Sequence, residues 1–237
     1  MTMLPVLMYH NVGERDRHLN VSSQALARQC RLLRSLGFRT ITLRELEERL
    51  RAGDLPRRTV VFTFDDALLG VYEHALPVLH RYGWLATVFA VSQKLGGVTD
   101  WAPRHRHRVM SPEQLAELHA QGWDVGAHTR THPHLTHLSP ESARQEIERC
   151  RDDLQQLTGA EVVSFCYPYG DLNAQVVQMV RTAGYRVACT VHKGLVRVQD
   201  DPLLLPRVPI AYSDGAGGLL YRLWRAWRYT TARARPY

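Results

Sequence analysis

The sequence contains few cysteines, and none of them are paired in a motif. There is no CxxC, so the sequence predicts neither a zinc knuckle nor a redox-active pair. The four cysteines are widely spaced, and each lies in an apolar segment: Cys30, Cys150, Cys166 and Cys189. We therefore expect reduced thiols in the protein core, which favours a reducing compartment.

Signals for export, membrane spanning and nucleotide binding are also missing. The first residues have neither a basic region nor a sustained apolar stretch, so we expect no secretory signal. No apolar run approaches the length of a transmembrane helix. Neither GxGxxG nor a Walker sequence is present, which disfavours a nucleotide-binding fold. These absences favour a cytoplasmic protein.

Lysine is nearly absent, although the chain is basic. Lys94 and Lys193 are the only lysines among 30 basic residues, and the net charge is +7. Such a charge suits an anionic partner, but an arginine bias can arise from genome composition alone. No nucleic-acid recognition module accompanies the charge, so we expect no nucleic-acid partner.

What the sequence does contain is a repeated alternation of helix and strand. Four predicted helices end in glycine followed by an aromatic residue and a short apolar strand, at Gly37, Gly83, Gly122 and Gly184. Eight candidate strands follow from this pattern: 5–9, 39–42, 59–64, 85–91, 123–127, 162–166, 185–190 and 203–210. Such alternation predicts right-handed βαβ units in an α/β fold, and this number of units suits a closed or nearly closed parallel barrel.

Polar residues follow several of these strands. Histidine or carboxylate side chains come directly after strands at His10, at Asp65 and Asp66, at His128 and at His192, and Tyr167-Pro168-Tyr169 follows another strand. In a parallel barrel the carboxyl ends of the strands share one face, where active sites are built. We expect these side chains to converge.

Two of these segments predict a metal site. In HTRTH, His128 and His132 are four residues apart, and Pro133 disfavours a long helix, so we expect one irregular turn. The adjacent carboxylates Asp65 and Asp66 repel each other unless a cation compensates. We assign Asp66 to the metal and Asp65 to proton abstraction from water. Two histidines and one aspartate leave coordination positions open, as catalytic sites require.

With these motifs in view, the sequence closely resembles the polysaccharide deacetylases with a NodB homology domain, carbohydrate esterase family 4. TFDD at 63–66, HTRTH at 128–132 and YPYG at 167–170 resemble the first three motifs of that family. The start LMYHNV resembles the poly-N-acetylglucosamine deacetylases. The resemblance covers about residues 4–210.

The resemblance implies a distorted (β/α)7 barrel that removes N-acetyl groups from amino sugars. It implies a divalent metal, zinc first, with cobalt, nickel, iron or manganese as alternatives. Carried over by motif, Asp65 is the base, and Asp66, His128 and His132 are the metal ligands. Tyr169 contributes its backbone N–H to the oxyanion, next to Tyr167 and Pro168 in the same motif.

The sequence departs from the family pattern in three places. Ala67 replaces the usual glycine, and Cys166-Tyr167 stands where an arginine commonly orients the base. The fourth motif is not visible. We expect Arg207, in LPRV of the last strand, to replace the missing arginine. The acid that protonates the leaving amine is left open between His10 and His192, and we favour His10.

We expect a barrel over residues 1–212 and a basic tail over 213–237. In the tail Leu220, Leu223, Trp224 and Trp227 form one stripe at helical spacing, with arginines off that stripe. The stripe can pack on the barrel or lie on an anionic membrane surface. The second alternative places the protein at the cytoplasmic face of the inner membrane.

Several substrate classes are compatible with these expectations. The acetamido sugar can belong to a polysaccharide or an oligosaccharide, or it can be linked to a lipid or a nucleotide. Removal of another acyl group, such as formyl, stays open. So does a carbohydrate-binding barrel that has lost its activity, although the intact set of metal ligands argues against it.

Overall fold

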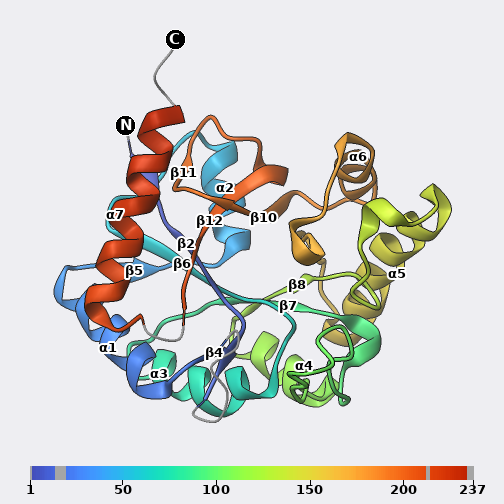
Figure 1. Cartoon of the computed structure of the whole chain (residues 1–237), viewed down its shortest axis with the longest axis horizontal. Coiled ribbons are helices and arrows are strands. Elements are labelled where there is room, and N and C mark those ends of the chain that lie inside the picture. The colour runs from blue at the N-terminus through green and yellow to red at the C-terminus, as the bar shows by residue number, and fades with distance from the viewer. Residues whose placement is uncertain (1, 14–19, 212–213, 234–237) are drawn as a thin grey trace.

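The computed structural model describes residues 2–13, 20–211 and 214–233. A closed barrel of seven parallel strands occupies its centre, with helices around it (Figure 1). In spatial order the strands are β2 (Val6–Tyr9), β12 (Leu205–Pro209), β10 (Val187–Lys193), β9 (Ser164–Cys166), β8 (Asp124–Ala127), β7 (Thr87–Ala90) and β6 (Thr59–Phe64). Pairing of β2 with β6 closes the barrel and confirms the predicted fold class.

All eight predicted strands are present, but one lies outside the barrel. The extra strand, β5 (Arg39–Thr40), pairs only with the beginning of β6. The barrel is distorted at two seams. A single residue pair joins β8 to β9, and the register between β10 and β12 shifts between Cys189 and Lys193. Short pairings, β1 (Met3–Leu4) with β11 (Val196–Arg197) and β3 (Asn11–Val12) with β4 (Asn20–Val21), lie beside the barrel.

The helices agree with the glycine positions that the sequence predicts for four of their ends. Seven of them surround the strands: α1 (Ser23–Ser35), α2 (Leu43–Arg51), α3 (Leu76–His80), α4 (Pro112–Ala120), α5 (Pro140–Thr158), α6 (Ala174–Thr182) and α7 (Ala216–Arg233). Ser22, Ser111 and Ser139 cap α1, α4 and α5 through their side-chain oxygens. The four predicted terminal glycines all have a positive φ, between 64° and 93°.

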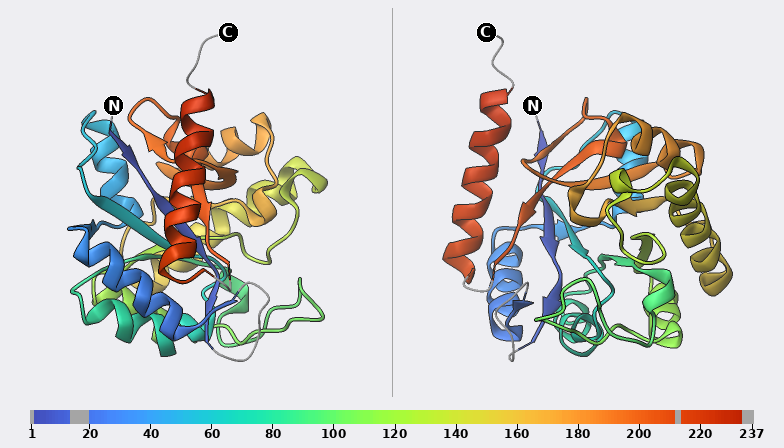
Figure 2. Two further views of the ribbon diagram at one scale, coloured as in Figure 1. Left: turned by 60° about the vertical axis from the view of Figure 1, so that its left-hand side comes forward. Right: turned by 45° about the vertical axis from the view of Figure 1, so that its right-hand side comes forward.

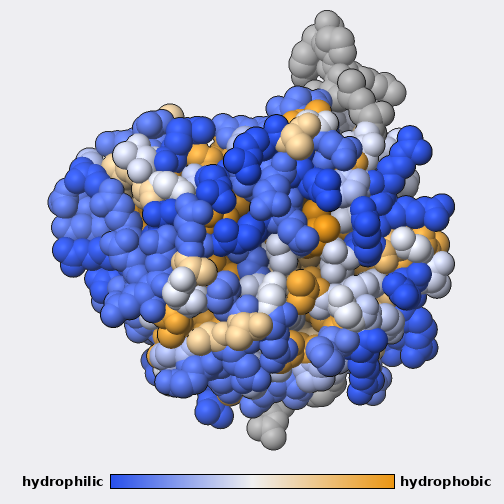
Figure 3. Space-filling model, turned by 180° about the vertical axis from the view of Figure 1, so that it is seen from behind, coloured by the Kyte–Doolittle hydropathy of each residue, from blue (hydrophilic) through white to orange (hydrophobic). Residues whose placement is uncertain are grey.

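The core lies inside the barrel and between the barrel and its helices. Every residue of β6, β7 and β8 is buried, as expected for parallel strands covered on both sides. The four cysteines are buried and free, which agrees with the prediction of core thiols. The surface seen from behind is mostly polar, with small apolar patches scattered over it (Figure 3).

The last helix, α7, packs along the outside of the barrel beside α1 and β12 (Figure 2). Its buried face consists of Leu219, Ala226 and Thr230, and the Thr230 hydroxyl accepts a hydrogen bond from the backbone N–H of Leu195 at 2.8 Å. The predicted stripe is therefore not the packed face, because Trp224 and Trp227 are each 49% exposed. Of the stripe, Leu223 packs against the core, beside Leu219 and the smaller residues Ala226 and Thr230.

Two further points concern the ends of the chain. Within the described residues, no helix combines the length and the apolarity needed to cross a bilayer. The expected boundary between barrel and tail, at 212–213, lies outside the described residues.

Candidate active site

The end of β6 brings two adjacent carboxylates into one site. The strand stops at Phe64, and the next residues turn sharply, with φ of 71° at Asp66 and 49° at Ala67. This left-handed turn breaks the alternation of side chains along the strand, so Asp65 and Asp66 are both directed into the buried interior. The following helical segment, η1 (Val71–Ala75), has no side-chain cap, so capping does not explain the aspartates.

Asp66, His128 and His132 lie at the spacing of metal ligands. The Asp66 Oδ1 atom is 3.6 Å from His128 Nε2 and 3.4 Å from His132 Nε2. Three ligand atoms, each about 2.0–2.2 Å from one zinc ion, have separations of this size. Asp66 Oδ1 is buried and has no hydrogen-bond partner among the described residues. The donor set and the unsatisfied oxygen both fit one divalent cation.

Local interactions orient the two histidines. His128 Nδ1 lies 2.7 Å from the carbonyl oxygen of Cys166, so Nδ1 carries the proton and Nε2 faces Asp66 as an acceptor. Burial lowers the pKa of His128 to about 4, which keeps its imidazole neutral. His132 and Thr129 have positive φ, and the His132 N–H donates to the Thr129 hydroxyl at 3.0 Å. This irregular turn agrees with the prediction for HTRTH.

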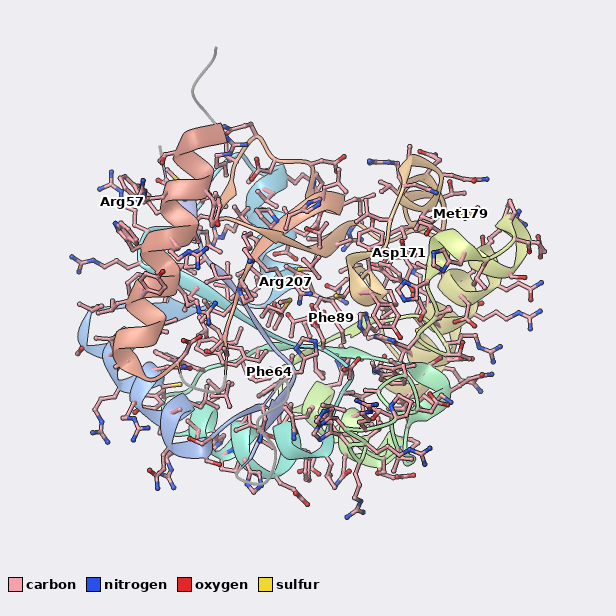
Figure 4. The ribbon with its side chains drawn as sticks, viewed as in Figure 1. Arg57, Phe64, Phe89, Asp171, Met179 and Arg207 are labelled. Carbon is pink, nitrogen blue, oxygen red and sulfur yellow. The ribbon has the colours of Figure 1, made fainter. Side chains whose placement is uncertain are left out.

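Asp65 forms a buried, two-pronged ion pair with Arg207. Arg207 Nη1 donates to Asp65 Oδ1 at 2.7 Å, and Nη2 donates to Oδ2 at 2.8 Å. Arg207 also donates to the carbonyl oxygen of Thr190 at 2.9 Å and lies near Phe89 at the centre of the molecule (Figure 4). Burial by itself would raise the pKa of Asp65, but the charge of Arg207 outweighs it and holds that pKa below its usual range.

Asp66 has no such arginine, and its electrostatics differ. Burial, together with repulsion from Asp65, raises the pKa of Asp66 well above its ordinary value. The Arg207 guanidinium therefore neutralises Asp65 alone, and Asp66 needs another cation to stay ionised. The metal site predicted from the sequence lies at the position where this charge is missing.

Cys166 contributes to the site in a way that the sequence analysis missed. Its Sγ is 3.2 Å from Arg207 Nη2 and 3.7 Å from Asp65 Oδ2. Asp65, His128 and Cys166 form a second group with the spacing of metal ligands. That group fits a metal less well, because Arg207 already neutralises Asp65 and burial raises the pKa of the Cys166 thiol. The thiol packs against the ion pair in protonated form.

The structure separates the two candidate acids. His10 Nε2 lies 3.8 Å from Asp65 Oδ2, and the His10 side chain is 21% exposed. His192 is exposed and lines a hollow of about 270 Å³ with Lys193 and Arg197. No hydrogen bond or ion pair within the described residues joins His192 to Asp65 or Asp66. The site therefore includes His10 and leaves His192 outside.

Within the described residues, Tyr169 is the member of the YPY segment whose ring contacts a candidate ligand, His132. Its ring centre is 4.5 Å from that of His132, and its backbone has a φ of 58°. Tyr167 is buried, and its hydroxyl donates to the carbonyl oxygen of Leu203 at 3.1 Å. Pro168 is buried in the turn between them. The structure thus places Tyr167 and Pro168 behind the site.

The sequence analysis also missed two aromatic rings near His132, those of Trp101 and His134. Trp101 stacks on His132 with ring centres 4.2 Å apart, and His134 stacks on Tyr169 at 3.9 Å. The Asp171 carboxylate lies 3.8 Å from His134 Nδ1. Trp101 belongs to a loop without hydrophobic periodicity, so its position carried no sequence signal.

Comparison with known proteins agrees with these observations. The model of a family described as polysaccharide deacetylase matches residues 52–188, which is more than half of the chain. The chain is 27% identical to YxkH of Bacillus subtilis, which its name assigns provisionally to the polysaccharide deacetylases; the match covers 91% of this chain and 73% of that protein. It is 24% identical to the poly-β-1,6-N-acetyl-D-glucosamine N-deacetylase of Staphylococcus epidermidis, over 92% and 82% of the two chains.

Solved structures share the fold. The deacetylase PplD of Streptococcus pyogenes, in complex with acetate, superimposes with a TM-score of 0.83 at 23% identity, over 94% of this chain and 98% of that chain. IcaB from Ammonifex degensii superimposes with a TM-score of 0.79 at 26% identity, over 93% and 96% of the two chains. Both likenesses extend over almost the whole barrel.

The buried ion pair generates a prediction about stability. Arg207→Met should lower the free energy of unfolding by about 3–5 kcal/mol, because it leaves the buried Asp65 carboxylate without a partner. Arg181→Met is the control, since Arg181 pairs with Asp201 at the surface at 3.3 Å and its loss should cost less than about 1 kcal/mol. Urea denaturation measures both. Equal losses in the two variants would show that Asp65 does not depend on Arg207.

Proposed function

The chain belongs to the polysaccharide deacetylase family of carbohydrate deacetylases, and we propose that it uses one divalent metal ion to remove N-acetyl groups from an amino sugar. The observation that carries this proposal is the set of Asp66, His128 and His132 at metal-ligand spacing, next to Asp65 held by Arg207. Catalytic metal sites keep open positions for water and substrate, and three protein ligands leave such positions.

We propose zinc as the metal, with cobalt, nickel, iron or manganese as alternatives, because imidazole and carboxylate ligands accept several first-row ions. When bound, the ion would polarise the acetamide carbonyl and lower the pKa of a water molecule. His128 and His132 are buried and neutral, so they present their Nε2 atoms for binding without first losing a proton.

The remaining steps belong to residues of this chain. Asp65 accepts the proton of the attacking water, since each carboxylate oxygen that pairs with Arg207 keeps a further lone pair. The backbone N–H of Tyr169 donates to the oxygen that gains negative charge. His10, beside Asp65, donates a proton to the leaving amine, because imidazole has an ordinary pKa near neutrality. Arg207 is a positioning residue that keeps Asp65 ionised.

The relatives support an N-acetylglucosamine-type substrate. The Staphylococcus epidermidis relative is named as a deacetylase of poly-β-1,6-N-acetyl-D-glucosamine. We propose for this chain an acetamido sugar of that type, in a polymer, in an oligosaccharide, or linked to a lipid or nucleotide. Acetate release from chitin oligosaccharides or an aryl acetate, with and without added metal, tests this. Formate release would identify a deformylase, and sugar binding without release would identify an inactive binding barrel.

We also propose peripheral contact between α7 and an anionic membrane at the cytoplasmic face. The support is the exposed side of α7: Tyr221, Trp224 and Trp227 are each 49–53% exposed, and Arg225 and Arg228 stack on neighbouring rings. Aromatic rings with arginines between them suit the interface of an anionic bilayer.

A first prediction separates the metal ligands from the base. Asp66→Ala, His128→Ala and His132→Ala should each lose bound metal and activity together. Asp65→Asn should keep the metal but lose turnover by roughly a hundredfold or more, the scale of general-base catalysis. Metal content by mass spectrometry and acetate release measure these effects, with the exposed His80→Ala as control. Normal turnover by Asp65→Asn would reverse the assigned roles of the aspartates.

A second prediction concerns the acid. His10→Ala should lower kcat by about a hundredfold or more while metal content is unchanged, because the leaving amine loses its proton donor. His192→Ala should have a much smaller effect, since His192 lies in a separate hollow. Steady-state kinetics on one soluble substrate compares the two. The opposite ranking would assign the acid to His192.

A third prediction concerns α7. Deleting the helix would remove buried core residues, so the test is the triple variant Tyr221→Ser, Trp224→Ser, Trp227→Ser. It should lose at least about tenfold in binding to phosphatidylglycerol vesicles, because each ring buries apolar area in the bilayer. Deacetylation of a soluble substrate should be unchanged. The control is Leu36→Ser with Val198→Ser, exposed residues outside α7. If the wild-type protein does not sediment with these vesicles, the proposal is wrong.

A further inference from the structure

A hollow of about 700 Å³ is lined by residues that follow His10 and Asp66 closely in the sequence. Its walls come from Asn11 in β3, from Gly70 and His74 at the start of η1, and from the loop that carries Arg106 and Arg108. Asn11 follows His10, and Gly70 lies four residues after Asp66. We name this space the Arg106–Arg108 hollow.

The arginine loop is fixed to the loop that carries the aspartates. The Met110 N–H donates to the Ala67 carbonyl oxygen at 2.9 Å, and the Leu69 N–H donates to the Arg108 carbonyl oxygen at 2.8 Å. Leu68 and Val109 form an antiparallel bridge at the same place. The backbone that presents Arg108 is therefore held at a constant position relative to Asp65 and Asp66.

Gly70 allows the opposite wall to approach. A Cβ atom at this position would lie 2.2 Å from the Val12 carbonyl oxygen and 2.3 Å from Asn11 Oδ1. Only glycine lets β3 lie against the start of η1 at this distance. The wall of the hollow is consequently continuous with the strand that ends at His10.

The charges of the hollow favour an anion. Arg106 and Arg108 face one carboxylate among the described lining residues, that of Glu73, and the imidazole of His74 adds a further donor. No ion pair within the described part of the chain engages either arginine. Asp100, which the charge of Arg106 influences, already pairs with Lys94 at 2.5 Å. Two exposed guanidinium groups thus remain available for a ligand.

We propose that the Arg106–Arg108 hollow is a subsite for an acidic group carried next to the acetamido sugar, either a carboxylate or a phosphate. This inference rests on the proposed function, because it assumes that the acetamide lies against Asp66, His128 and His132. A sugar chain that leaves this centre past His10 enters the hollow, where its acidic group meets Arg106 and Arg108. The substrate is then an anionic glycan or sugar conjugate, and a neutral homopolymer would leave the arginines without a partner.

The test uses ligands that differ only in charge. They are a neutral N-acetylglucosamine tetrasaccharide, the same tetrasaccharide with one terminal uronic acid, and the same with one terminal phosphate. Calorimetric binding is measured with the metal removed, so that no turnover occurs, and kcat/KM is measured with the metal-loaded protein. At least one acidic ligand should bind about tenfold more tightly than the neutral one, the effect expected of hydrogen bonds to a charged group. Whichever acidic ligand binds more tightly identifies the acid.

The variants make the test specific to this hollow. The double variant Arg106→Gln, Arg108→Gln should lose the preference for acidic ligands and bind the neutral one as before. Arg104→Gln, on the same exposed loop but outside the lining residues, should keep the preference. Raising the salt concentration from about 50 to about 500 mM should also weaken the preference of the wild-type protein for acidic ligands.

Two results would overturn the proposal. One is equal binding of neutral and acidic ligands by the wild-type protein, and the other is a preference that survives in the double variant. Tight binding of an acidic ligand without release of acetate from any of the three would instead contradict the proposed deacetylase activity and leave the subsite standing.

Discussion

The site depends on an imbalance of buried charge. Asp65 and Asp66 are adjacent, buried and close to one another, but one guanidinium, that of Arg207, pairs with Asp65 alone. A buried carboxylate without a partner is costly, so Asp66 must bind a proton or a cation. The neutral imidazoles of His128 and His132 supply ligands but no charge. A divalent ion at this position would restore the balance.

Closure of the barrel supplies the guanidinium. Arg207 belongs to β12, which pairs with β2, and β2 in turn pairs with the aspartate-bearing β6. Its side chain crosses the barrel interior to Asp65 and fills the space beside Cys166 of β9. The partner of Asp65 therefore comes from a strand that is not a direct neighbour of β6. This is physically sufficient, because a closed barrel directs residues of all seven strands toward one interior.

Outside the barrel, two surfaces carry arginine for different reasons. On α7 the guanidinium groups of Arg225 and Arg228 stack on exposed aromatic rings, and the buried side of the helix carries Leu219, Ala226 and Thr230. In the Arg106–Arg108 hollow the guanidinium groups belong to a loop that is hydrogen-bonded to the turn after Asp66. Stacking on rings and binding of acidic groups are interactions that arginine makes better than lysine, which is consistent with the scarcity of lysine in this chain.

The sequence by itself determined the features that depend on local chemistry. Helix caps, terminal glycines, eight strands and the HTRTH turn are set by neighbouring residues, and the candidate ligands Asp66, His128 and His132 were found from short motifs. Tertiary structure decided what depends on distant segments meeting. It placed His10 and not His192 beside Asp65, brought Trp101 onto His132, and turned the aromatic stripe of α7 away from the barrel. No local pattern encodes these outcomes, because they follow from barrel closure and from which helix face fits the space available.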